Sequence, residues 1–216
     1  MRDLSSRLSR QPRNWRGADL TDARMARAHL VDADFLEARL PGANLDRANL
    51  EGARLDRANL TAASLQGAHM AHAKFRDADL TGADLSIGRH ERGSSSTAHY
   101  ANFSRALLDR SILSRARLTY AVFDGASLRS ADLSRATLVA ADMRGADLRD
   151  AVLRFTDLRR ARLEGADLRG TDLSFADLSG TNLTGAEYDE TTVWRGARYN
   201  QRTRWRDGER LRPPLD

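Results

Sequence analysis

The residues best suited to chemistry in this 216-residue chain are its many carboxylates and its five histidines. Paired carboxylates can act as general acid and base, and clustered histidines can bind a metal ion. The histidines, however, show no metal-ligand spacing, and the aspartates recur so regularly that a pair at catalytic distance is expected by chance. The sequence also lacks a glycine-rich phosphate loop and a nucleophile elbow. We therefore predict no enzyme activity, no metal site and no cofactor.

A five-residue repeat positions these side chains. From Ala18-Asp19-Leu20 onward every fifth residue is Ala, with an apolar residue two places later. A first block holds fourteen such frames, from Ala18 to Ala83, and a second holds eighteen, from Ala101 to Ala186. In the second block Ala is replaced only by small residues, namely Ser111, Thr156, Thr171 and Thr181. Such self-similarity at a fixed period indicates a repeat architecture.

A period of five fits neither regular secondary structure. On a helix the apolar stripe would wander around the cylinder, and on a flat strand successive leucines would point to opposite faces. The pattern is satisfied if the chain turns once per repeat, so that each Ala and Leu returns to one interior. We therefore predict stacked coils that pair backbone to backbone about 4.8 Å apart.

Frames such as Ala43-Asn44-Leu45, Ala78-Asp79-Leu80 and Ala166-Asp167-Leu168 resemble the pentapeptide repeat family, over roughly residues 16–195. The resemblance implies an all-β fold, a right-handed quadrilateral β-helix with four pentapeptides per coil and about eight coils. We divide the chain into an N-terminal segment (1–15), two repeat blocks (16–87 and 101–190), an inserted loop (88–100) and a C-terminal cap or dimerisation segment (191–216).

The net charge of +5 lies in the ends of the chain, because residues 1–15 carry +3 and residues 191–216 carry +4. The two repeat blocks carry −2 and −1. Direct nucleic-acid binding would need the seven arginines of residues 195–212 to converge on one face, and we do not expect it. The chain has no cysteine and no apolar run of membrane-spanning length, so we expect a cytoplasmic protein.

The residue before each apolar centre should face outward, and in the C-terminal half it is often acidic. The acidic ladder that we predict consists of Asp147, Asp157, Asp167, Asp172, Asp177 and Glu187. Twenty-residue coils would place Asp147, Asp167 and Glu187 in one column and Asp157 and Asp177 in the next. Such a row could imitate nucleic-acid phosphates, or, given the interleaved arginines, form an ion-paired solvated face.

Several apolar residues occupy outward positions, namely Leu107, Ile112, Val122, Val152, Phe155 and Phe175. They predict a surface that contacts a partner or is covered by the inserted loop or the N-terminal segment.

Two further segments are candidates for binding. Gly88, Gly93 and three consecutive serines predict a flexible loop whose charged tip could bind a partner, although a tolerated insertion stays open. The tip consists of Arg89, His90, Glu91 and Arg92. An aromatic cluster near the C-terminus could cap the rod or join two rods end to end, and it consists of Tyr188, Val193, Trp194, Tyr199 and Trp205.

The resemblance also suggests a function, because it extends to Qnr- and MfpA-like members that join through their C-terminal ends and protect topoisomerases. It implies a homodimeric DNA mimic that binds DNA gyrase or topoisomerase IV. Such a protein would protect the enzyme from quinolone-like or natural-product poisons, in antibiotic resistance or self-immunity. The alternative is a general protein-interaction scaffold of the same fold.

Overall fold

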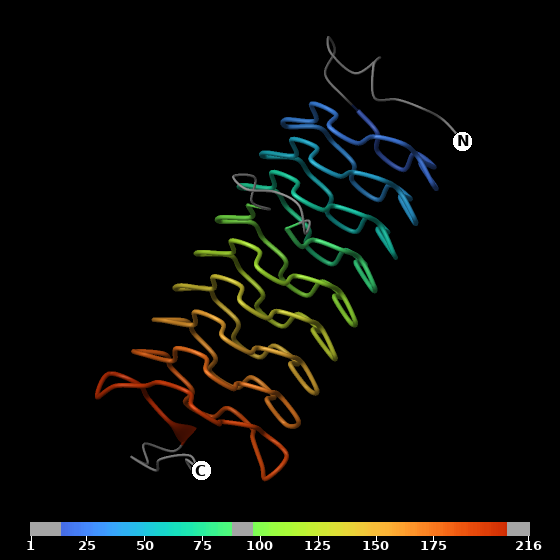
Figure 1. Cartoon of the computed structure of the whole chain (residues 1–216). Helices are drawn as coiled ribbons and strands as arrows, with labels where there is room; N and C mark the ends of the chain where they lie inside the picture. The colour runs from blue at the N-terminus through green and yellow to red at the C-terminus, as the bar shows by residue number, and fades with distance from the viewer. Residues whose placement is uncertain (1–13, 88–96, 207–216) are drawn as a thin grey trace.

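The computed structural model describes residues 14–87 and 97–206, and these residues form one rod of stacked square coils (Figure 1). Within this part of the chain the β structure consists of isolated parallel bridges, each one residue long, and no longer strand or α-helix forms. Each bridge joins the residue before an apolar centre to its counterpart one coil later, as Asp19 joins Arg39. The predicted right-handed quadrilateral β-helix is confirmed.

The bridges form four ladders along the rod, which we call faces 1 to 4 after their first residues, Asn14, Asp19, Arg24 and His29. The ladder on face 4 is needed below, and it runs through His29, Asn49, His69, Thr97, Arg117, Thr137, Asp157, Asp177 and Arg198. The described ladders complete nine coils, one more than predicted, because bridging extends past the Ala-x-Leu frames at both ends.

The ends of the rod follow the same coil with different residues. Trp15 takes the first centre on face 1, and Trp194, Tyr199 and Trp205 take the last three. Bridges that join residues 21 or 22 apart, such as Asp172 to Val193, show that single-residue insertions shift the spacing there. The last coil therefore begins before residue 191 and continues into the predicted C-terminal segment.

The second block begins earlier than the sequence indicates. Thr97 bridges both His69 and Arg117, so residues 97–100 belong to the coil, although we expected the insertion to extend through Tyr100. Ala98 fills the inward centre where Leu or Phe normally stands and is only 1% exposed. A repeat pattern that requires a large apolar residue at the inward centre does not detect this frame.

A tight turn closes nearly every repeat. In the turn between Leu20 and Ala23, the N–H of Ala23 donates to the carbonyl of Leu20 at 3.0 Å, and the intervening Asp22 has a φ of 53°. Left-handed φ at this position defines a type II turn, which favours glycine. In the described residues the position is left-handed 33 times, with 12 glycines and 21 other residues. The turn N–H of Asp22 also donates to the next coil, to Pro41 O at 2.9 Å, so stacking holds the turn in place.

Stacking also builds the core. The inward Ala and Leu side chains are almost completely buried, and Phe75, Phe103 and Phe123 stack inside face 1 with centroids 4.8 and 4.9 Å apart. Where Thr replaces Ala its hydroxyl is satisfied, because Thr171 Oγ1 donates to the carbonyl of Leu148 at 2.8 Å. Thr156 and Thr181 do the same with Leu133 and Leu158.

The Phe ladder yields a prediction of stability. Phe103→Ala should lower the free energy of unfolding by about 3–5 kcal/mol, because it leaves a cavity between two stacked rings. Phe103→Leu restores the usual centre residue of the repeat and should cost less than about 1.5 kcal/mol. Urea denaturation of both variants measures the difference, and equal losses would contradict a tightly packed ring ladder.

Candidate interaction surface

The predicted partner-binding tip, Arg89, His90, Glu91 and Arg92, lies outside the described residues. The structure therefore places only the other candidates.

The predicted acidic ladder is divided among three faces. Asp147, Asp167 and Glu187 lie on face 2, whereas Asp157 and Asp177 lie on face 4. The expectation that these two columns are adjacent is wrong, because ten residues make two frames and two frames reach the opposite side of a four-sided coil. Asp172 lies on face 3 between them. The six residues therefore form no single row, and the longest column is the three carboxylates on face 2.

Most of these carboxylates help to form the turns. Asp172 Oδ1 accepts the backbone N–H of Ser174 at 2.9 Å, and Asp177 Oδ1 accepts that of Ser179 at 3.0 Å. Asp167 bonds to the N–H of Arg169 in the same way. This contact two residues ahead is the turn that Asp and Asn side chains favour. The recurrence of Asp before each centre therefore has a local structural cause.

Every member of the predicted ladder is also paired with arginine. Asp167 receives two hydrogen bonds from the Arg169 guanidinium, and Arg149 pairs with Asp147 at 2.6 Å. Glu187 lies 3.4 Å from Arg169. The remaining pairs are Asp157 with Arg159, Asp172 with Arg154 and Asp177 with Arg198. Of the two alternatives left open by the sequence, the geometry favours the ion-paired face.

Pairing with arginine changes the pKa of Asp167. The hydrogen bond from Arg169 holds the pKa of Asp167 below its usual value of 3.8, although partial burial opposes the shift. A carboxyl with a lowered pKa in the folded state contributes stability above its unfolded pKa and loses it as the pH falls further. This contribution is therefore present at neutral pH and disappears in acid.

Arg169→Ala should raise the pKa of Asp167 toward 3.8, which carboxyl ¹³C NMR titration measures directly. The loss of stability at pH 7 should stay below about 1 kcal/mol, because the pair is exposed to solvent. Arg160→Ala is the matched control, since Arg160 makes no ion pair with another described residue. An unchanged pKa of Asp167 in the first variant, or an equal rise in the control, would contradict the pairing.

The C-terminal aromatic residues pack on one another within the chain. Tyr188 contacts Trp194, Trp194 contacts Trp205 and Tyr199 contacts Trp205, each ring edge to face at 5.3–5.6 Å. Trp194 and Trp205 are only 4% and 6% exposed, whereas Val193 faces outward and is 41% exposed. This arrangement covers the last coil with indole rings.

The outward apolar residues do not form one surface. Leu107 lies on face 2, Val122 on face 1, and Ile112 and Val152 on face 3. Phe155 and Phe175 stack at the corner between faces 3 and 4, with centroids 4.9 Å apart. Phe155 is 50% exposed and therefore lies on the outside of the coil.

The structure contains a second exposed stack of rings, which the sequence did not lead us to predict. His72, Tyr100 and Tyr120 occupy consecutive left-handed turn positions at the corner between faces 4 and 1, with centroids 5.2 and 5.0 Å apart. The signal was the 20-residue spacing of Tyr100 and Tyr120, but the uncertain frame around Thr97 hid it. Face 4 is therefore bordered by exposed rings at both corners.

Other site types find no support in the described part of the chain. There, no three His, Asp or Glu side chains gather as ligands for a metal ion. The same residues form no helix of the length and apolar character needed to cross a bilayer.

Comparisons with known proteins agree with this geometry. The pentapeptide-repeat family model matches residues 16–52, 53–86, 111–150 and 146–185. The chain is similar to the crystal structure of HetL from Nostoc sp. strain PCC 7120, a pentapeptide repeat protein involved in heterocyst differentiation regulation. HetL shares 29% identity with a TM-score of 0.65, over 95% of this chain and 94% of HetL.

A more distant similarity is found with QnrB1, a plasmid-mediated fluoroquinolone resistance protein. It shares 22% identity with a TM-score of 0.31, over 80% of this chain and 83% of that one. Comparison with curated protein sequences gives no match.

Proposed function

The chain belongs to the pentapeptide-repeat family, and from this premise we propose that it is a non-enzymatic rod that binds another protein through its outer surface. One observation carries the proposal, namely that exposed aromatic rings stand at turn positions where the fold does not need them. Tyr100, Tyr120, Phe155 and Phe175 have φ of 58–60° and are 45–53% exposed. Bulky residues in this conformation are strained, and such strain is retained where it serves function.

The similarity to HetL is consistent with a binding role, because HetL is described as taking part in regulation. The fold also suits binding, since stacked coils hold side chains on a rigid frame and little ordering entropy is lost on association. A cytoplasmic location stays a prediction.

The more specific hypothesis is protection of DNA gyrase or topoisomerase IV by DNA mimicry. It requires a row of unpaired negative charge, and the arginines paired with Asp147, Asp167 and Asp172 leave little of it. For the C-terminal aromatic residues we propose capping rather than a homodimer interface, because Trp194 and Trp205 are buried within the chain. We therefore place the scaffold function first.

Photo-crosslinking from each side of the rod tests this function. Benzoylphenylalanine replaces Tyr120 at the edge of face 4, Leu107 on face 2 or Ile112 on face 3, in tagged protein expressed in the source organism. We expect one protein to be captured from one side and not from the others. Capture of a gyrase or topoisomerase IV subunit would support the more specific hypothesis, and capture from no position, or of the same proteins from all, would contradict a binding rod.

A further inference from the structure

Charge is strongly segregated around the C-terminal part of the rod. We define the basic face as face 4 from Thr97 onward with the turns on either side of it, which comprises residues 97–100, 114–120, 134–140, 154–160, 174–180 and 195–202. These segments contain nine arginines and two carboxylates, whereas the rest of residues 97–206 contains nine arginines and twelve carboxylates. A chain whose repeat blocks are nearly neutral thus has one positively charged side.

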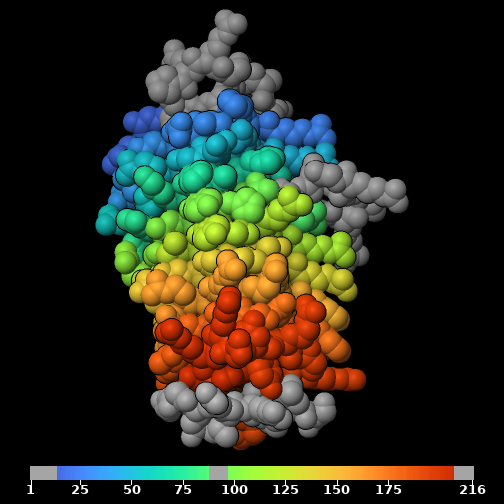
Figure 2. Space-filling model, turned by 90° about the vertical axis from the view of Figure 1, so that its left-hand side faces the viewer, coloured from blue at the N-terminus to red at the C-terminus, as the bar shows by residue number. Residues whose placement is uncertain are grey.

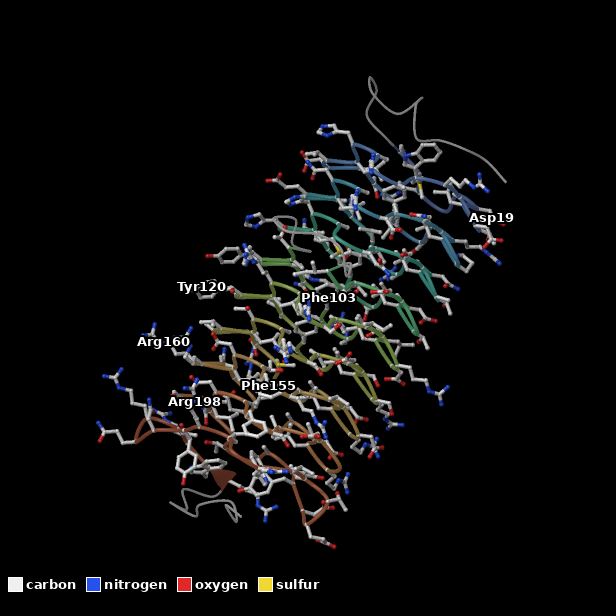
Figure 3. The ribbon with its side chains drawn as sticks, viewed as in Figure 1. Asp19, Phe103, Tyr120, Phe155, Arg160 and Arg198 are labelled. Atoms are coloured by element: carbon white, nitrogen blue, oxygen red, sulfur yellow. The ribbon has the colours of Figure 1, made fainter. Side chains whose placement is uncertain are left out.

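The arginines of the basic face are largely free to bind. Both carboxylates there are engaged, Asp157 by Arg159 and Asp177 by Arg198. Six arginines make no ion pair with any residue in the described ranges, and these are Arg115, Arg117, Arg135, Arg160, Arg195 and Arg202. Arg160 and Arg198 project with Tyr120 from the same side of the rod in Figure 3, and this side faces the viewer in Figure 2.

The same face carries the four exposed aromatic rings, two at each edge. Most of their flat surfaces are already covered, because Tyr100 stacks on His72 and Tyr120, and Phe155 lies between Arg135 and Phe175. The outer side of Phe175 lies so close to Gly196 that a Cβ there would be 2.7 Å from the ring. Mainly ring edges therefore meet solvent, and the edge is the positive part of an aromatic quadrupole.

We propose that the basic face binds an acidic, extended segment of a partner protein, an inference that rests on the proposed binding function and specifies its partner. Free guanidinium groups bind carboxylates, and the flanking ring edges add apolar contact and a favourable electrostatic field. A single-stranded nucleic acid fits less well, because its bases stack on open ring faces and most faces of these rings are covered. Five coil spacings span about 24 Å, the length of seven or eight extended residues.

Fluorescence anisotropy tests this inference with three labelled probes, a twelve-residue peptide of repeated Glu-Ser-Leu, its Gln-Ser-Leu analogue and a twelve-nucleotide oligo(dT). We expect the Glu peptide to bind saturably at 50 mM salt and the Gln peptide not to bind. Binding should weaken as salt is added, because the contact is largely electrostatic.

Two charge-reversal triples locate the site. Arg115→Glu, Arg117→Glu and Arg135→Glu together should weaken binding of the Glu peptide by at least about tenfold. Arg39→Glu, Arg76→Glu and Arg110→Glu change the charge equally on other sides of the rod and should have less than about a twofold effect, because charges there are distant and screened. Circular dichroism checks that both triples fold.

A ring variant separates the two polyanions. The double variant Phe155→Asn and Phe175→Asn removes both rings and places at each turn a residue that tolerates left-handed φ. It should weaken binding of the Glu peptide more than binding of oligo(dT). Absence of saturable peptide binding, equal loss in both triples, or oligo(dT) binding as tight as the peptide and unaffected by the ring variant would overturn the inference. Crosslinks from face 2 or 3 alone would also overturn it and leave the binding rod standing.

Discussion

The turn that closes each repeat is the interaction on which the rest of the structure depends. Its left-handed residue costs free energy wherever it is not glycine, and 21 such residues occur in the described chain. The backbone hydrogen bonds between coils offset that cost, because the N–H of each of these residues donates to a carbonyl one coil later. The coil is therefore stable as a stack, as expected for repeat proteins whose units contact only their neighbours.

Because the coil depends on its turns and its interior, only certain outward positions of each frame can vary in sequence. With the interior committed to Ala, Leu and Phe, the outward residue and two turn residues of each frame are free to vary. On faces 1 to 3 of the C-terminal coils they form Asp-to-backbone bonds and Arg–Asp pairs, which serve the turns. Face 4 has such bonds and pairs only at Asp157 and Asp177, and many of its other outward and turn positions hold free arginines and stacked rings, which do not serve the turns. A rigid rod thus carries distinct chemistry on one side.

The sequence predicts the fold well because the period is a direct record of the geometry. It predicts the surface less well for identifiable reasons. The small centre at Ala98 hid a frame, so the coil number of Tyr100 was uncertain, and single-residue insertions near Val193 hid the last coil. Asp157 and Asp167 differ in sequence by two frames, yet they stand on opposite sides of the rod. Pairing with Arg159 and Arg169 required side-chain positions, which no spacing supplies.

Reaction with phenylglyoxal, followed by peptide mass spectrometry, measures most directly whether the arginines of the basic face are free of ion pairs. The reagent attacks the uncharged guanidine, and pairing with Asp142 and Asp167 raises the pKa of Arg144 and Arg169. We predict that at low salt Arg115, Arg117 and Arg160 react several-fold faster than Arg144 and Arg169. Equal rates for the two groups would contradict the segregation of free and paired arginines, and with it the assignment of binding to this face.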